Sequence, residues 1–224
     1  MLIVSVLRMS KEYQPLHVQW LHRQLVGYDS LCISDCEDIE GVKTAPLLYN
    51  FPSWWAKIEA FNPKHPIIGN KDILLFDIDT VITGDLTPFL QQKKFTTLTD
   101  FYYENLSFKP VGSAIMYIPY EIKSHVWSLF MQDPEKWIYK QSTPPYHGDQ
   151  GFLSSCTTPA RWQDVLPDYI ISYKKNIAKK GMPGWNSGRS QGNGTLPKNA
   201  RIVVFHGKPR PWEIDLEWVP RLIY

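Results

Sequence analysis

The chain has 224 residues, of which 43% are hydrophobic and 14% are aromatic. This composition supplies enough apolar surface for a folded core and excludes an intrinsically disordered protein, and the length suits one domain. The 24 Lys and Arg residues against 22 Asp and Glu residues give a net charge of +2, which by itself indicates neither a nucleic-acid nor a membrane partner.

Apolar runs that predict strands alternate with stretches of helical spacing. In chain order the predicted elements are a strand at 2–8, a helix at 12–25, a strand at 30–34, a helix at 52–61, strands at 72–79 and 111–119, helices at 120–132 and 148–156, and a strand at 201–207. This alternation is typical of an α/β fold with a mostly parallel central sheet flanked by helices. We expect one domain over residues 1–224.

The segment 174–210 differs from the rest of the chain in composition. It contains no Asp or Glu, but it contains nine Lys and Arg residues. Its middle part, 179–199, is rich in Gly, Ser and Asn, which is typical of a loop and not of a packed element. We therefore expect a mobile basic loop at about 179–199.

The N-terminus and the cysteines indicate the compartment. Residues 1–10 lack the basic region, the long apolar core and the cleavage site of a signal peptide. No run of about 20 apolar residues predicts a transmembrane helix. The three cysteines do not have the spacing of a zinc site, and an odd number cannot pair completely. We expect a cytoplasmic protein with reduced thiols.

Two carboxylates lie where the predicted strand at 72–79 ends. Asp77 and Asp79 are two residues apart, so on a strand they face the same side, roughly 6–7 Å apart at the backbone. Ligands of open parallel sheets bind at the carboxyl ends of the strands, and two carboxylates there can bind one divalent cation. Asp is also common in ordinary turns, so the Asp-x-Asp tripeptide alone is not specific.

One interpretation of the segment "LLFDIDT" is a phosphatase of the haloacid dehalogenase type, which it resembles letter for letter. In that class Asp77 would be the nucleophile and Asp79 the general acid. The phosphatase motif closes the first strand of its domain, whereas here two predicted strands precede it. The C-terminal half also offers no convincing acidic pair for magnesium. This interpretation is the alternative.

Several segments together resemble the GT-A glycosyltransferases, especially family 8 and its glycogenin-like relatives. The segment "ILLFDIDTVITGDLTPF" resembles their metal-binding segment, and companion segments occur in the family's order. These are "WWAKIEAF", "KPVGSAIMYIP", "HGDQGFLSS" and "VVFHGKPRPW". The resemblance covers residues 1 to about 212. It implies the GT-A fold, with a Rossmann-like sheet, and metal-dependent transfer of a sugar from a nucleotide-sugar donor, which we expect to be a UDP-sugar.

The resemblance implies a metal site built from Asp77, Asp79 and His206. These residues would bind Mn²⁺ or Mg²⁺, which bridges the donor phosphates and stabilises the charge of the leaving group. Carboxylate and imidazole ligands suit Mn²⁺. A histidine at a strand end is, taken alone, more often structural. The neighbouring family segment is what favours a ligand role for His206.

Further residues are implied to bind the donor. Lys57 would lie near the donor, and Arg8 at the end of the first strand would shape the nucleobase pocket. Gly207 would allow the backbone to approach the phosphates. The family's phosphate-binding lysine corresponds to Lys208, but its spacing from the histidine departs from the commoner pattern. Whether Lys208 or Arg210 binds the diphosphate therefore stays open.

The catalytic residues implied by the resemblance are Asp149 and Gln150, which would face the donor sugar. Asp149 would accept hydrogen bonds from sugar hydroxyls and orient the ring. Gln150 would lie near the anomeric carbon. Since an amide is a poor nucleophile, retention would proceed by front-face attack within an ion pair. His147 beside them is either structural or acceptor-facing.

The acceptor is the least defined part of the prediction. A glycan or lipid-linked saccharide is one class of acceptor. The basic segment suggests a hydroxymethylated DNA base as another, because Lys174 and Lys175 would bind a nucleic-acid backbone and Trp185 would stack on a base. A binding module without turnover is a further alternative, although the complete set of implied site residues argues against it.

Overall fold

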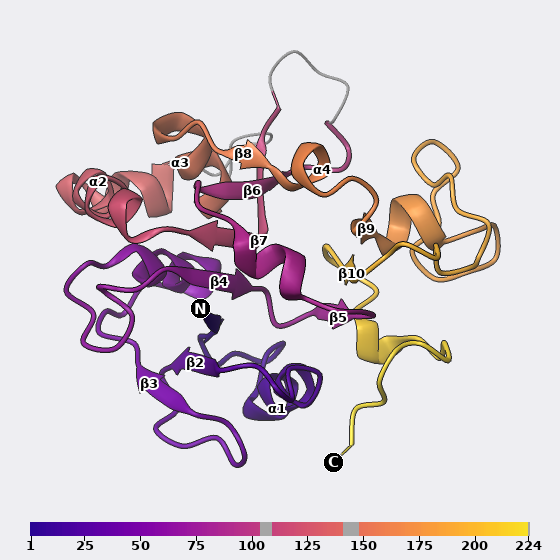
Figure 1. Cartoon of the computed structure of the whole chain (residues 1–224), viewed down its shortest axis with the longest axis horizontal. Coiled ribbons are helices and arrows are strands. Elements are labelled where there is room, and N and C mark those ends of the chain that lie inside the picture. The colour runs from indigo at the N-terminus through magenta and orange to yellow at the C-terminus, as the bar shows by residue number, and fades with distance from the viewer. Residues whose placement is uncertain (104–108, 141–147, 224) are drawn as a thin grey trace.

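The protein is described by a computed structural model that covers residues 1–103, 109–140 and 148–223. Within these residues, seven strands form a central sheet in the order β3-β2-β1-β4-β7-β6-β8 (Figure 1). The strands are β1 (Leu2–Leu7), β2 (Ser30–Ser34), β3 (Thr44–Pro46), β4 (Ile73–Phe76), β6 (Thr96–Thr99), β7 (Val111–Ile118) and β8 (Ala160–Arg161). Only β7 pairs antiparallel to its neighbours, so the predicted α/β fold with a mostly parallel sheet is confirmed.

Three shorter strands form a second sheet in the order β5-β10-β9. They are β5 (Thr80–Ile82), β9 (Ile170–Ser172) and β10 (Ile202–Val204), with β10 antiparallel to β5 and parallel to β9. The predicted strand at 201–207 is therefore real but shorter, and it lies outside the central sheet. Figure 1 shows this second sheet beside the end of β4.

The helices cover both faces of the central sheet. The α-helices are α1 (Pro15–Arg23), α2 (Tyr120–Gln132), α3 (Gly148–Cys156) and α4 (Trp162–Val165). The 3-10 helices are η1 (Ser53–Phe61), η2 (Thr87–Gln91) and η5 (Pro211–Glu213), and the π-helices are η3 (Lys136–Lys140) and η4 (Tyr173–Ile177). Three predicted helices are confirmed as α1, α2 and α3, whereas the one predicted at 52–61 is the 3-10 helix η1. In the part of the chain that the structure describes, no helix has both the length and the apolar character needed to cross a bilayer.

The two faces of the central strands pack against different layers, because alternate residues of a strand point to opposite sides. Ile3 and Leu74 belong to a core cluster that includes α1 and the second sheet. Val4 and Leu75 belong to another, which includes η1, α2 and α3. All four side chains are buried. Burial on both faces explains why these strands are continuous apolar runs.

The predicted strand at 72–79 ends earlier than expected. β4 stops at Phe76, although the amide of Asp77 still donates a hydrogen bond of 2.8 Å to the carbonyl of Ala114 in β7. Ile78 and Asp79 lie in the short link that takes the chain from the central sheet into β5. Asp77 and Asp79 are therefore not strand neighbours. They lie at the carboxyl end of β4, where the two sheets meet.

Candidate functional site

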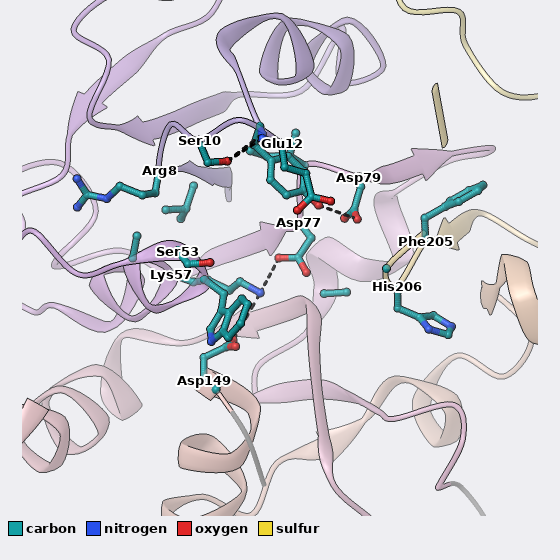
Figure 2. A pocket seen from close by; sticks show the side chains of 18 of the residues that line it. Arg8, Ser10, Glu12, Ser53, Lys57, Asp77, Asp79, Asp149, Phe205 and His206 are labelled. Carbon is teal, nitrogen blue, oxygen red and sulfur yellow. Dashed lines mark hydrogen bonds and ion pairs between the residues drawn. The ribbon is translucent and has the colours of Figure 1, made fainter. Parts of the chain in front are cut away.

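A cavity of about 450 Å³ opens at the carboxyl ends of β1 and β4 (Figure 2). Its walls come from the loop after β1, η1, the β4–β5 link, the first turn of α3 and the segment after β10. The predicted site residues that line it are Arg8, Lys57, Asp77, Asp79, Asp149, Gln150, His206, Gly207 and Arg210. Residues far apart in the sequence thus meet in one place, as ligand-binding sites of open α/β sheets do.

Lys57 connects two carboxylates in the floor of the cavity. Its Nζ lies 2.6 Å from Oδ1 of Asp77 and 3.5 Å from Oδ2 of Asp149, and it also donates to Oγ of Ser113 at 3.1 Å. Figure 2 shows Lys57 and Asp77 pointing toward each other. Burial lowers the pKa of Lys57, but the charges of Asp149 and Asp77 outweigh it and raise the pKa above its usual value. Lys57 is therefore a fixed ammonium group.

One buried oxygen of Asp149 forms the 3.5 Å ion pair with Lys57 but accepts no hydrogen bond from the described residues. The residue is 4% exposed, and its Oδ2 accepts no hydrogen bond from the described residues. A buried carboxylate oxygen without a donor costs free energy, because water no longer solvates it. Since Asp149 also lines the cavity, this oxygen is an acceptor available to a ligand hydroxyl.

Asp79 is held by Arg210 and Tyr13. The Tyr13 hydroxyl donates to Oδ2 of Asp79 at 3.0 Å, and the Arg210 guanidinium forms an ion pair with the same oxygen. Arg210 also donates to Oε1 of Glu12, with Nη2 at 2.6 Å, and its guanidinium lies 5.0 Å from the Tyr13 ring centre. Sequence reasoning missed Tyr13 and Glu12, since nothing in the loop pattern distinguishes them from other polar residues.

The pKa values of both carboxylates are raised. Burial is the main cause for both Asp77 and Asp79, and the charge of Asp77 raises the pKa of Asp79 further, while Arg210 and Tyr13 oppose the rise. The Asp79 carboxylate is buried, and that of Asp77 is partly exposed. Two neighbouring carboxylates repel each other, and a positive charge bound beside them relieves this repulsion. Their oxygen donors fit a divalent cation such as Mn²⁺ or Mg²⁺.

His206 lines the cavity, but its ring contacts Ser172 and Phe101 and not the carboxylates. Nε2 lies 2.7 Å from Oγ of Ser172, and the ring stacks on Phe101 with a centroid distance of 5.9 Å. Figure 2 shows the imidazole pointing away from Asp77 and Asp79. Burial, and secondly the charge of a neighbouring lysine, lowers its pKa to about 4. Among the described residues, no three His, Cys, Asp or Glu side chains converge closely enough to hold a metal ion.

The geometry separates the two candidates for phosphate binding. Lys208 is on the outside, where its side chain is 74% exposed and its Nζ lies 3.6 Å from Oε1 of Glu213. The Arg210 side chain is 12% exposed and lines the cavity. Gly207, which precedes both of them in the sequence, has a φ of 73°, which favours glycine. Of the two cations, the one inside the cavity is Arg210.

The predicted acceptor residues do not line the cavity. Nζ of Lys175 donates to the carbonyl of Phe101 at 2.9 Å, and Trp185 packs against the core. Nζ of Lys174 comes closest, because it lies near Gly207. His147 lies outside the described residues. The cavity therefore offers no basic groove that includes these three described residues.

The segment 179–199 has no helix or strand. Two backbone hydrogen bonds join it to η4, from Gln191 to Lys175 at 2.7 Å and from Gly194 to Ile177 at 2.8 Å. A Cβ at Gly192 would lie 2.2 Å from the carbonyl carbon of Ile177. The segment thus packs against η4, and its predicted mobility stays a prediction.

Comparison with known proteins gives similarity in structure only. No protein-family model matches the chain, and no curated protein sequence matches it. A crystal structure of the galactosyltransferase LgtC in complex with donor and acceptor sugar analogs is similar, with a TM-score of 0.55 and 12% identity over 95% of this chain and 89% of LgtC. An active-site mutant of LgtC gives a TM-score of 0.56 with 11% identity and the same coverage.

Two longer glycosyltransferases contain the same fold. The apo form of GlyE from Streptococcus pneumoniae TIGR4 gives a TM-score of 0.53 at 10% identity, over 94% of this chain and 55% of GlyE. The apo structure of the bifunctional glycosyltransferase WbbM gives 0.57 at 10% identity, over 94% of this chain and 46% of WbbM. At such low identity the similarity shows the fold alone, and that fold is the GT-A glycosyltransferase fold, as the resemblance in sequence implied.

The fold removes the basis of the phosphatase alternative. That interpretation needs the Asp-x-Asp motif to close the first strand of its domain, but here the motif follows β4. Instead, 95% of the chain shares its fold with the LgtC glycosyltransferase. Asp77 is also tied to Lys57 by a 2.6 Å ion pair, which is an ordinary arrangement for a binding carboxylate.

Proposed function

We propose that the chain is a metal-dependent glycosyltransferase that transfers a sugar from a nucleotide-sugar donor, a UDP-sugar, to an acceptor hydroxyl with retention. The observation that carries this proposal is the cavity at the carboxyl ends of β1 and β4, where Asp77, Asp79, Lys57, Asp149 and Arg210 meet within a glycosyltransferase fold. A volume of about 450 Å³ lies in the range of small-molecule sites. Cations and carboxylates alternate in its floor, which suits an anionic diphosphate joined to a neutral sugar.

The diphosphate end of the donor is assigned to the carboxylate pair and Arg210. Asp77 and Asp79 would hold Mn²⁺ or Mg²⁺, which offsets the charge that develops on the leaving phosphate. His206 would join them once its ring leaves Ser172. Arg210 would exchange Asp79 for a phosphate oxygen, since a guanidinium binds phosphate through paired N–H donors. Charge neutralisation at this end would thus be shared by protein and cation.

The nucleoside end is assigned to the loop after β1. Arg8 lines the cavity and is fixed there, because Nη1 lies 3.3 Å from Oδ2 of Asp35 and Nη2 donates to the carbonyl of Tyr49 at 2.5 Å. Its Nε is buried and makes no hydrogen bond with the described residues. A nucleobase or ribose oxygen would satisfy this donor. We therefore keep Arg8 as a donor-binding residue.

The sugar end is assigned to α3 and Lys57. Oδ2 of Asp149, which has no hydrogen bond with the described residues, would accept one from a sugar hydroxyl, and the ammonium group of Lys57 would keep Asp149 ionised. Gln150, at the start of the same helix, would lie at the reacting carbon. Its amide would orient the sugar and would not form a covalent bond. The acceptor hydroxyl would then attack from the face that the diphosphate leaves.

We propose a hydroxyl of a glycan or lipid-linked saccharide as the acceptor. The alternative of a hydroxymethylated DNA base relied on Lys174, Lys175 and Trp185, and none of these lines the cavity. Lys175 and Trp185 have contacts of their own within the fold. The net charge of +2 adds no support for a nucleic acid.

The experiment is a screen for nucleoside diphosphate release from a panel of nucleotide sugars, with Mn²⁺ and with a chelator. Metal-dependent release from one donor is expected. The variant Asp149→Asn should lose this release and still bind the nucleoside diphosphate, since it changes the sugar end only. Absence of release from every donor, with and without simple alcohol and sugar acceptors, contradicts the proposal.

A further inference from the structure

One large aromatic side chain of the cavity has no part in the donor chemistry described above. Trp54 lies in the first turn of η1 and lines the cavity, and it is 54% exposed. Its neighbour Trp55 is 4% exposed and belongs to the core. An aromatic ring left open on a cavity wall is a favourable contact surface for the apolar face of a ligand.

Two unusual backbone positions hold the indole in place. Ser53, just before it, has a φ of 53°, in the left-handed region that costs a residue other than glycine about 1–2 kcal/mol. Gly148, the first residue of α3, has a φ of 69°, and a Cβ on it would lie 2.6 Å from Nε1 of Trp54. The indole therefore rests on the backbone of the helix that carries Asp149 and Gln150. Strain of this kind is typical of functional sites.

The cavity has a buried floor and an open rim. Asp79 and Asp149 are 5% and 4% exposed, whereas the Trp54 side chain is mostly open to solvent. Trp54 and Lys57 belong to the same short helix, η1, and both line the cavity, so the Trp54 wall adjoins the charged floor, in which Figure 2 shows Lys57 and Asp77. A donor that reaches the floor leaves the open side for a second substrate. Trp54 therefore lies where an acceptor would enter, next to the residues assigned to the donor sugar.

The charges of this wall favour an uncharged ligand. Lys57 is the only Lys or Arg between residues 44 and 61, and it is already shared by Asp77 and Asp149. A nucleic acid that stacks on Trp54 would need free cations nearby for its phosphates, and this wall supplies none among the described residues. A pyranose has no charge, and its C–H face is apolar while its edge carries hydroxyls. Ser53 and Gln150, which also line the cavity, offer polar partners to that edge.

We propose that Trp54 is the platform of the acceptor subsite and stacks on the apolar face of an uncharged pyranose ring. This inference rests on the proposed function and deepens it, because it assigns the acceptor class and its place. A change of Trp54 to alanine should raise the half-saturating concentration of a sugar acceptor by roughly tenfold, since stacking and the buried area are both lost. Trp54→Phe keeps part of the platform and should give an intermediate value.

The first arm of the test observes the ring directly. The probes are methyl glucoside, methyl galactoside and methyl mannoside, titrated into the ¹⁵N-labelled protein with UDP and Mg²⁺ present. The Nε1–H signal of Trp54 is assigned by its absence in Trp54→Phe. At least one glycoside should shift this signal saturably. If no glycoside shifts it, the proposal is overturned, whether or not the enzyme releases nucleoside diphosphate from a donor.

The second arm measures turnover and separates the competing outcomes. A glycoside that shifts the signal should stimulate diphosphate release. The apparent affinity for this glycoside should be highest in the wild type, intermediate in Trp54→Phe and lowest in Trp54→Ala. Tyr120→Ala is the matched control, because Tyr120 is 48% exposed and does not line the cavity. The proposal is overturned if the Nε1–H signal of Trp54 responds to UDP and to no glycoside. It is also overturned if a single-stranded oligonucleotide shifts this signal at lower concentrations than any glycoside does. Donor release without an acceptor tests the proposed function separately.

Discussion

Replacing Arg210 by methionine should destabilise the metal-free protein. The side chains of Arg210 and Asp79 are 12% and 7% exposed, so their ion pair is largely buried. Removing one partner of such a pair costs about 3–5 kcal/mol, because the remaining charge stays buried without compensation. The contact of Arg210 with Glu12 adds little, since that carboxylate is 46% exposed. For a chain of this size, a loss of about 3 kcal/mol lowers the melting temperature by roughly 6–12 °C.

The assay is urea unfolding of wild type and Arg210→Met, each with a chelator and with Mn²⁺. In the wild type a cation competes with Arg210 for Asp79, whereas in the variant it replaces the missing charge. Mn²⁺ should therefore restore more stability to the variant than it adds to the wild type. The double variant Asp79→Asn/Arg210→Met should recover most of the loss in chelator. Equal midpoints of wild type and Arg210→Met in chelator would refute the reasoning.

Three further outcomes are expected, each measured by urea unfolding. Burial lowers the pKa of His22 to about 4 from an ordinary 6.5, so the unfolded chain binds the proton more tightly. Neutral His22 therefore contributes about 3 kcal/mol to the free energy of unfolding above pH 6.5, and this contribution is lost as the pH falls toward 4. His22→Gln should remove this dependence of stability on pH. Gly192→Ala should cost about 1–3 kcal/mol by overpacking against Ile177, whereas Gly188→Ala, which has room, should change stability by at most about 0.5 kcal/mol. Equal effects of the two glycine variants would show that the segment is not packed as described. Lys57→Met should lower the free energy of unfolding by about 3 kcal/mol at neutral pH. The loss should be smaller at acidic pH, because the carboxylates of Asp77 and Asp149, left without Lys57, take up protons. A loss of stability that does not change with pH would contradict this.

The sequence predicts four of the seven strands that the structure describes in the central sheet, because these four are buried on both faces. Such strands appear as continuous apolar runs, and this pattern indicates β1, β2, β4 and β7 directly. Of the second sheet it indicates β10 alone, as the strand expected at 201–207. It does not indicate β5 and β9, which have three residues each and pair with β10 across long stretches of chain. Nor does it reveal that β7 runs antiparallel, since periodicity carries no information on direction.

The candidate site is predictable where a residue belongs to a compact motif. Asp77 and Asp79 stand out because two carboxylates follow an apolar strand. Tyr13 and Trp54 do not stand out, because their roles depend on contacts made across the fold with Arg210 and Gly148. Patterns within a segment do not specify such contacts.

The choice between two neighbouring cations also needed the structure. Lys208 and Arg210 are both cationic and lie two residues apart, so the sequence does not distinguish them. In the structure the Lys208 side chain is exposed, whereas the Arg210 side chain lines the cavity. The same holds for His206, whose Nε2 lies 2.7 Å from Oγ of Ser172 although the family resemblance implies a metal-ligand role. Side-chain direction is set by neighbouring elements, and these come from elsewhere in the chain.

The central claim is that Asp77 and Asp79 bind the cation that holds the donor's diphosphate. Its most direct test is calorimetric titration of UDP into the protein, with Mn²⁺ and with a chelator. The variants are Asp79→Asn and the matched control Asp85→Asn, whose aspartate lies in the same segment outside the cavity. We expect Mn²⁺-dependent binding in the wild type and in Asp85→Asn, and loss of the Mn²⁺ effect in Asp79→Asn. Equal UDP affinity with Mn²⁺ and with chelator, or an unchanged Mn²⁺ effect in Asp79→Asn, would contradict the claim.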